Sequence, residues 1–259
     1  MRTRAFGICR FVVLVRKARN MELQQLYSKV RKAIDTYNMI DDGDVLALGI
    51  SGGKDSLTLL YALSGLCKFY PKQFKLIAIT VDLGYDGFNL DAISELCQSL
   101  GVEYHIVKTK ISEMITNDGC SLCARLRKGA LHDEALRLGC TKIVYAHNMD
   151  DVVETMMLSL IYEGRFSTFY PVTDYTDKGL KLIRPLVFTT NSEIVGFKNK
   201  YELPIASNPC PYDKNSERAY VRELLNDINR HAHDVKKRMM TAICDGTLKE
   251  WGINPEDNK

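Results

Sequence analysis

The sequence lacks a strong net charge, a high cysteine content and any long hydrophobic run, and each absence excludes a class of protein. Its 35 basic and 32 acidic residues leave a formal charge of +3, and 46% of its residues are hydrophobic, which excludes an intrinsically disordered chain. Eight cysteines among 259 residues are too few for a disulfide scaffold, which needs about 8–10% cysteine. The hydrophobic run at residues 11–15 is far shorter than the ~20 residues of a membrane-spanning helix.

The first twenty residues differ from the rest because they contain six basic residues and no acidic one. A targeting or surface-binding arm is one interpretation. The favoured interpretation is an upstream start or a disordered basic arm, with Met21 opening the folded part.

Short, almost wholly apolar runs alternate with helical patterns after Met21, which indicates βαβ units. The expected strands are residues 45–50, 76–81, 104–107, 142–146 and 182–186. The expected helices are residues 23–37, 57–69, 90–100 and 122–138, and the chain after Pro211 is expected to be helical to about Cys244. We therefore predict an α/β fold with an open parallel sheet of about five strands, helices on both faces, an N-terminal helix and a helical C-terminal region. In such a sheet, the ligand binds beyond the carboxyl ends of the strands.

A glycine-containing loop follows the first expected strand and opens a helix. In residues 51–56, Gly52 and Gly53 allow a tight turn that brings backbone N–H groups close to an anion, and Lys54 adds a positive charge. The loop is not a Walker A motif, because Leu48 and Asp55 occupy the positions of its first glycine and its Ser/Thr. The loop therefore predicts a phosphate site, with a simple glycine turn as the alternative.

Three cysteines lie in loops or at a helix start. Cys120 and Cys123 form a C-x-x-C pair where the third inter-strand helix begins, and Cys210 stands between two prolines. Three thiolates suit an iron–sulfur cluster with one open iron, whereas structural zinc usually takes four ligands and a lone pair can be a redox dithiol. The other five cysteines, whose number fits a reducing cytoplasm, are expected to fill the core or the basic arm: Cys9, Cys67, Cys97, Cys140 and Cys244.

Residues 51–56 resemble the PP-loop of ATP pyrophosphatases, which split ATP into AMP and pyrophosphate. Combined with the three cysteines, the chain resembles the tRNA 2-thiolation enzymes, closest to the 2-thiocytidine synthetase group (TtcA), with some features of the 2-thiouridine group (TtuA). The matching segments are residues 37–40, 51–56, 120–127, 146–151 and 184–186, within a resemblance that spans residues 37–230. Two departures concern the branch. The cytidine enzymes have a second cysteine pair where this chain has only Cys210, and the uridine enzymes have terminal zinc fingers that this chain lacks.

The resemblance implies a Rossmann-like fold of the PP-loop (HUP) type and a set of site residues. The nucleotide and Mg²⁺ residues would be Ser51, Gly52, Gly53, Lys54, Asp55, Ser56, Asp82, His147 and Asp151. Cys120, Cys123 and Cys210 would hold a [4Fe–4S] cluster, and with Asp55 and Asp150 they are the expected catalytic residues. The alternatives are a helix cap for Asp150 and Asp151, a structural histidine for His147 and a turn role for Asp82.

The resemblance also implies ATP and Mg²⁺ as cofactors, tRNA as substrate, and a sulfur donor such as a cysteine desulfurase or sulfide. We expect a cytoplasmic homodimer without membrane association. Candidate tRNA contacts are Arg125, Arg127 and Lys128, or alternatively His231, His233, Lys236, Lys237 and Arg238. The expected organisation is a basic arm at 1–20, a PP-loop domain at 21–230, and a helix and tail at 231–259.

The leading hypothesis is therefore ATP-dependent, iron–sulfur-dependent tRNA thiolation, most simply at a cytidine of the anticodon loop. Adenylation would turn a ring C2 oxygen into a leaving group, which sulfur then replaces. The alternatives are a 2-thiouridine synthetase, an adenylating ligase whose cysteines bind zinc, and a non-catalytic nucleotide- or metal-binding module.

Overall fold

The structure is a computed structural model that describes residues 21–115, 120–175, 179–206, 210 and 217–246. The predicted basic arm at residues 1–20 and the tail from residue 247 lie outside the described residues. Within the described part of the chain, no helix combines the length and the apolar character needed to cross a membrane.

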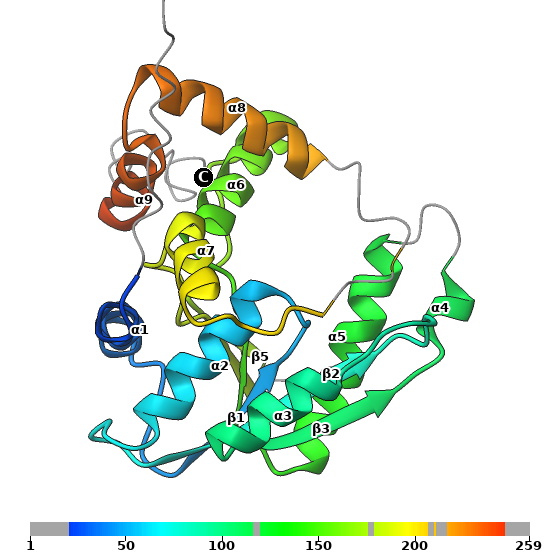
Figure 1. Cartoon of the computed structure of the whole chain (residues 1–259). Helices are drawn as coiled ribbons and strands as arrows, with labels where there is room; N and C mark the ends of the chain where they lie inside the picture. The colour runs from blue at the N-terminus through cyan, green and yellow to red at the C-terminus, as the bar shows by residue number, and fades with distance from the viewer. Residues whose placement is uncertain (1–20, 116–119, 176–178, 207–209, 211–216, 247–259) are drawn as a thin grey trace, which may run out of the picture.

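A six-stranded sheet forms the centre of the fold, in the order β3-β2-β1-β4-β6-β5 (Figure 1). The strands are β1 (Asp44–Gly49), β2 (Phe74–Asp82), β3 (Glu103–Lys108), β4 (Lys142–Val144), β5 (Val172–Tyr175) and β6 (Leu180–Ile183). All neighbouring pairs are parallel except β5 and β6. The predicted parallel sheet of about five strands is confirmed, and the structure adds one antiparallel strand at its edge.

The additional strand β5 has little signal in the sequence, because its four residues are half-buried or exposed and show no apolar alternation. The strand predicted at 182–186 is shifted: β6 begins at Leu180 and ends at Ile183. Its early end has a local reason, since Pro185 has no N–H to donate to a strand ladder.

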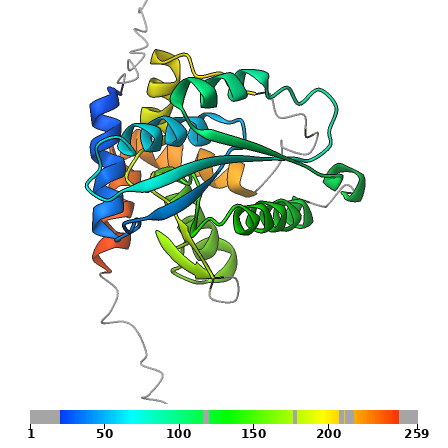
Figure 2. The same cartoon turned by 90° about the horizontal axis from the view of Figure 1, so that it is seen from below.

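Helices cover both faces of the sheet, as predicted. They are α1 (Leu23–Thr36), α2 (Lys54–Leu66), α3 (Asp91–Leu100), α4 (Ile111–Met114), α5 (Cys120–Arg137), α6 (Met149–Leu158), the π-helix η1 (Ser159–Glu163), α7 (Asn191–Lys200), α8 (Glu217–His231) and α9 (Val235–Asp245). Figure 2 shows the green helix α5 on the opposite side of the sheet from α2 and α3. Of these helices, α4, α6, η1 and α7 were not predicted.

Strand β1 shows how the two faces are filled. Leu46 and Leu48 point into the larger core with α1, α2 and α7, whereas Ala47 points into a smaller core that contains Leu131 and Ala135 of α5. Alternate side chains of a strand point to opposite faces, so the nearly continuous apolar run of β1 reflects burial on both sides.

The C-terminal region differs from the single helical stretch that was expected up to Cys244. Helix α8 ends at His231, and α9 begins after Asp234, whose backbone is left-handed with φ +59°. Both helices pack against α6 (Figure 1). The interruption between the two helices at residues 232–234 lets α9 turn back toward the start of α6. The resulting contact between Lys236 of α9 and Asp150 of α6 lies beside the candidate site.

The strand order places a topological switch point between β1 and β4. The chain proceeds from β1 outward to β2 and β3, then returns to add β4 on the other side of β1. The loops that follow β1 and β4 therefore lie next to each other at the carboxyl edge, where ligands bind in open α/β sheets.

Candidate active site

The loop after β1 is preformed by its own serines. The backbone N–H of Ser51 donates to Oγ of Ser56 at 3.2 Å, Gly53 N–H donates to Oγ of Ser51 at 3.3 Å, and Oγ of Ser56 donates to the Gly53 carbonyl at 3.0 Å. Gly52 has φ +81°, a left-handed conformation that favours glycine. The loop is thus held as a compact turn at the N-terminus of α2, which is suited to an anion.

A cavity of about 620 Å³ opens at this edge of the sheet, a size that suits a nucleotide. The predicted nucleotide residues that line it are Ser51, Gly53, Asp55, Ser56, Asp82, His147 and Asp151. Apolar and aromatic walls come from the strand ends and α5, including Ile79, Val81, Leu131 and Tyr145. The structure therefore brings together residues from three loops that are spread over about a hundred positions of the sequence.

Two of the carboxylates that line this cavity, Asp55 and Asp151, are linked by Asn148. The side-chain amide of Asn148 donates to Oδ1 of Asp55 at 2.9 Å, and its backbone N–H donates to Oδ2 of Asp151 at 2.9 Å. Burial raises the pKa of Asp151, and the charges of Asp55 and Glu154 add to the effect. Two oxygen-rich groups in one cavity form a donor set that fits Mg²⁺, which prefers carboxylates, waters and phosphates.

Asn148 was not among the predicted site residues, although the sequence held a signal for it. Its Oδ1 accepts from the N–H groups of Asp150 and Asp151, which makes it the N-cap of α6. An asparagine that precedes two acidic residues at a helix start is typical of an N-cap. Its second role, as a donor to Asp55, depends on the adjacency of β1 and β4.

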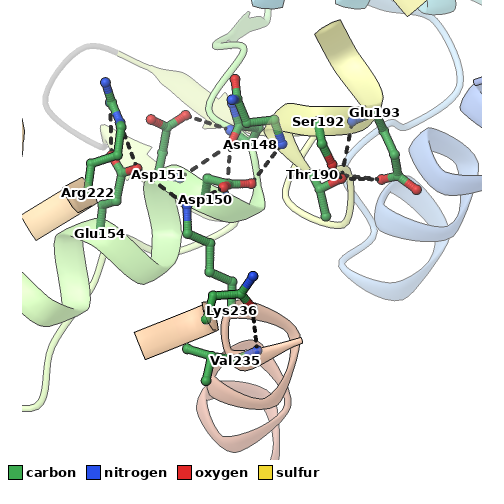
Figure 3. Close-up of polar contacts among 12 residues, drawn as sticks. Asn148, Asp150, Asp151, Glu154, Thr190, Ser192, Glu193, Arg222, Val235 and Lys236 are labelled. Atoms are coloured by element: carbon green, nitrogen blue, oxygen red, sulfur yellow. Dashed lines mark hydrogen bonds and ion pairs between the residues drawn. The ribbon is translucent and has the colours of Figure 1, made fainter. Parts of the chain in front are cut away.

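Asp150 points away from the cavity, so the structure does not bring it together with the loop (Figure 3). Its Oδ1 accepts from Nζ of Lys236 on α9 at 2.7 Å, and its Oδ2 accepts from the backbone N–H of Asn191 on α7 at 2.7 Å. Lys54 likewise contacts a neighbour rather than the cavity: its Nζ lies 2.7 Å from Oδ2 of Asp55.

His147 lines the cavity as a neutral imidazole. Burial, together with the nearby positive charges of Arg184 and Arg218, lowers its pKa to about 4. Nε of the buried Arg184 donates to His147 Nδ1 at 3.3 Å, which assigns the remaining ring proton to Nε2. Arg184 therefore fixes the orientation of the histidine rather than projecting into the cavity.

Asp82 also lies at the cavity, at the end of β2, where its Oδ1 accepts from the N–H of Gly84 at 2.9 Å. In the described part of the structure, no hydrogen bond occupies its other oxygen, Oδ2, so this atom can accept from a ligand hydroxyl. This position suits a ribose or adenine contact, and the turn role that was the alternative for Asp82 is present in the structure.

The cysteine-bearing segments reach the cavity from two sides. Cys123 is half-buried in the first turn of α5, and Ala124 and Arg127 of the same helix line the cavity. On the other side, Ala206 lines the cavity and donates its N–H to the Gly52 carbonyl at 3.1 Å, four residues before the half-buried Cys210. The side chain of Cys120 lies outside the described residues, and the described side chains alone form no cluster of three metal-ligating groups.

Three of the other described cysteines have a different chemical character, whereas Cys244 is exposed and does not fill the core as expected. Burial raises the pKa of Cys67, Cys97 and Cys140 to about 11 in each case. These thiols stay protonated at neutral pH, so they are poor metal ligands.

The two candidate tRNA clusters have different environments. Arg127 and Lys128 of α5 line the cavity, and Arg125 beside them is exposed. In the second cluster, Lys236 is engaged with Asp150 and Lys237 lies 3.2 Å from Asp234. The α5 cluster is therefore the one that adjoins the site.

Comparison with known proteins agrees with these motifs. A family model described as the PP-loop domain matches residues 18–228. Relatives named tRNA-cytidine(32) 2-sulfurtransferase, from Geobacter sulfurreducens and Citrifermentans bemidjiense, are 32% and 35% identical over 86% and 85% of this chain and 90% and 89% of theirs. The chain belongs to the PP-loop family of tRNA 2-thiolation enzymes. The resemblance predicted from the sequence is thereby confirmed.

A solved structure of a tRNA thiolase has a similar fold. The U34-tRNA thiolase NcsA from Methanococcus maripaludis, solved with its [4Fe-4S] cluster, has a TM-score of 0.71 and 29% identity, covering 87% of this chain and 78% of that chain. This similarity confirms the predicted PP-loop fold for a member of the tRNA 2-thiolation family.

Proposed function

We propose that this chain is an ATP-dependent, iron–sulfur-dependent tRNA sulfurtransferase that converts a cytidine of the anticodon loop to 2-thiocytidine. The observation that carries the proposal is the hydrogen bond between Ala206 and Gly52. It ties Ala206, four residues before Cys210, to the phosphate loop, while α5, which carries Cys123, lines the same cavity with Ala124 and Arg127. Adenylation and sulfur chemistry need such a shared location.

The first step is the activation of the base by ATP. The C2 oxygen of cytosine attacks the α-phosphorus, the bond to pyrophosphate breaks, and the base becomes O-adenylated. Ser51, Gly53 and Ser56 would hold the leaving pyrophosphate, and Asp55 and Asp151 would hold Mg²⁺, which would supply positive charge for that leaving group. The neutral His147 offers its Nε2–H as a donor without repelling the metal.

The second step replaces the adenylate by sulfur and releases AMP. The proposed ligands of a [4Fe–4S] cluster are Cys120, Cys123 and Cys210, and three thiolates match a cluster with one open iron. Their location fits the cluster, because Cys123 lies at a helix N-terminus, which favours thiolates. When bound, such a cluster supplies a site for the incoming sulfur. The apolar walls around Val81 and Tyr145 limit the access of water, which would otherwise hydrolyse the adenylate.

The names of the relatives support cytidine over uridine, whereas the name of the structural neighbour includes U34. We propose tRNA and a sulfur donor, such as a cysteine desulfurase or sulfide, as the partners of a cytoplasmic homodimer. We also propose that residues 21–230 form the catalytic PP-loop domain and that the C-terminal region from residue 231 supports it through α9.

Anaerobic reconstitution of the full chain tests the proposal. We expect about four iron and four sulfide per chain, the content of one [4Fe–4S] cluster, and ATP-dependent formation of 2-thiocytidine in tRNA. Cys120→Ala, Cys123→Ala and Cys210→Ala should each abolish thiolation while ATP binding survives. Cys67→Ala is the matched control, because that thiol is half-buried and protonated.

Three results would contradict the proposal. A colourless protein with stoichiometric zinc would favour an adenylating ligase. Thiolation retained by any of the three cysteine variants would remove that residue from the ligand set. Formation of 2-thiouridine in place of 2-thiocytidine would move the chain to the other branch of the family.

A further inference from the structure

Four exposed aromatic side chains, Tyr162, Phe166, Tyr170 and Tyr220, form a surface that we call the aromatic ridge. Their exposed fractions are 51%, 50%, 73% and 56%. Leu160 and Ile161 add exposed apolar area beside Tyr162. So many large apolar side chains in one short segment mark an interaction surface rather than ordinary surface variation.

The ridge is held in place by specific bonds, although its side chains are exposed. The N–H of Arg165 donates to the Ser159 carbonyl at 3.2 Å, closing the turn after the π-helix η1. Oγ1 of Thr168 donates to the Val152 carbonyl of α6 at 2.9 Å. The Tyr162 hydroxyl donates to Glu217 at the start of α8, which joins the ridge to the helix that carries Tyr220.

The ridge leads directly to the cavity. Phe169, next to Tyr170, packs on the His147 ring with centroids 4.9 Å apart. The Tyr170 carbonyl accepts from Nη1 of Arg184 at 2.6 Å. Arg218, two residues before Tyr220, lies 4.0 Å from Asp151. The ridge therefore begins next to His147 and Asp151, which line the proposed site of adenylation.

Arginines flank the ridge. Arg165 is exposed within it, and the side chains of Arg218 and Arg222 on α8 are 43% and 54% exposed, although Arg218 lies 4.0 Å from Asp151 and Arg222 pairs with Glu154. Two carboxylates also lie beside the ridge: Glu163 accepts from Ser159 and Glu217 accepts from Tyr162. Aromatic rings next to arginines form the usual platform for unstacked nucleobases.

We propose that the aromatic ridge binds the anticodon loop of the tRNA substrate by stacking its bases, and so delivers the target base to the cavity. This inference rests on the proposed function, because it assigns a surface to the RNA substrate of that reaction. A single-stranded loop fits better than a second copy of the chain, because arginine and aromatic side chains alternate along the ridge and its end opens into the cavity. A buried contact between copies would block that opening.

Binding of a synthetic anticodon stem-loop RNA to the full chain tests the inference. Tyr170→Ala and Tyr220→Ala should each weaken RNA binding roughly tenfold, and Tyr170→Phe and Tyr220→Phe should restore it, because stacking needs only the ring. ATP affinity should stay unchanged. The slope of log Kd against log salt should not change in the tyrosine variants, whereas Arg165→Gln should reduce it by about 0.7, the value for one phosphate contact on a single strand.

Phe69→Ala is the matched control, because Phe69 is 54% exposed and lies outside the ridge. Equal RNA affinity in the wild type and the alanine variants, with thiolation intact, would contradict the proposed role of the ridge in RNA binding but would not contradict the proposed function. Conversion of a dimer to a monomer without a change in RNA affinity would make the ridge an interface between copies. Absence of RNA binding by the wild-type chain would overturn the proposed function itself.

Discussion

Lys236 of α9 donates from Nζ to Oδ1 of Asp150 at 2.7 Å, and the same carboxylate accepts the backbone N–H of Asn191 with its other oxygen. Three helices, α6, α7 and α9, thereby meet at one side chain (Figure 3). The two partners are largely buried, with 19% and 13% of their side chains exposed. The contact fixes the first turn of α6, which also carries Asn148 and Asp151.

Lys236→Ala should reduce the free energy of unfolding by about 2 kcal/mol or more, because it leaves the Asp150 charge without its ion-pair partner. Lys237→Ala is the matched control: its ion pair with Asp234 is 58% and 66% exposed and should contribute less than about 1 kcal/mol. Urea unfolding of both variants measures the difference. Equal losses would show that the Asp150 contact has no special role in stability.

Gly52→Ala should both destabilise the protein and weaken ATP binding. An added Cβ at Gly52 would lie 2.9 Å from Cβ of Ala206, in addition to the cost of φ +81°, whereas Gly43 has φ +82° and nothing within 4 Å. Gly43→Ala should therefore cost about 1–2 kcal/mol, and Gly52→Ala about 1–3 kcal/mol more.

The double variant Gly52→Ala/Ala206→Gly separates these two contributions. It removes the close contact while leaving the backbone cost, so its unfolding free energy should approach that of Gly43→Ala. If the double variant is no more stable than Gly52→Ala alone, the contact with Ala206 is not the cause of the loss.

Asn148→Asp and Asn148→Ala should fail in different ways. Aspartate preserves the N-cap of α6 but puts a like charge in place of the amide that donates to Asp55 at 2.9 Å. It should keep the stability within about 1 kcal/mol and alter the Mg²⁺ dependence of ATP binding. Alanine should lose about 1 kcal/mol through the cap. Isothermal titration and urea unfolding distinguish the two. Identical Mg²⁺ titrations of Asn148→Asp and the wild type would refute the proposed contact.

His147 should make the protein less stable as the pH falls from about 6.5 to about 4. Its pKa is lowered to about 4 in the folded protein from 6.5, so the unfolded chain takes up a proton first and unfolding becomes easier in this window. The unfolding free energy of the wild type minus that of His147→Gln should fall by about 3 kcal/mol as the pH is lowered from 6.5 to 4.

Replacement of the exposed His233 by glutamine controls for the loss of an imidazole in general. A wild-type minus His147→Gln difference that stays constant from pH 4 to pH 6.5 would mean that His147 is accessible to protons in the folded state.

Most of the cavity was predictable because parallel strands bring their carboxyl ends to one edge. The apolar runs located β1, β2 and β4, and the residues directly after them, such as Ser51, Asp82 and His147, converge for that reason alone. The orientation of Asp150 and Asp151 was not predictable in this way. Neighbouring helical residues point about 100° apart, and only the packing of α7 and α9 determines which of them faces the cavity.

Local sequence patterns also did not predict the aromatic ridge or strand β5. Residues 160–170 contain several large apolar side chains, a composition that favours burial, yet many of them are exposed at the surface. Strand β5 contains four residues and gains its place by pairing with β6, a contact that only the tertiary fold supplies. The side chain of Cys120 and the remaining chain around Cys210 lie outside the described residues, so the cysteine ligand set stays a prediction.

The reversed direction of β5 determines which edge of the sheet the ridge can reach. Since β5 runs antiparallel, with Val172 opposite Ile183, its first residue lies where all the parallel strands have their last. Residues 160–171 are therefore delivered to the carboxyl edge, whereas a parallel strand would have received them at the far edge. The antiparallel edge strand β5 thus lets the chain place the aromatic ridge beside its nucleotide loops without an insertion into those loops. The ridge and the nucleotide loops can therefore change independently in evolution.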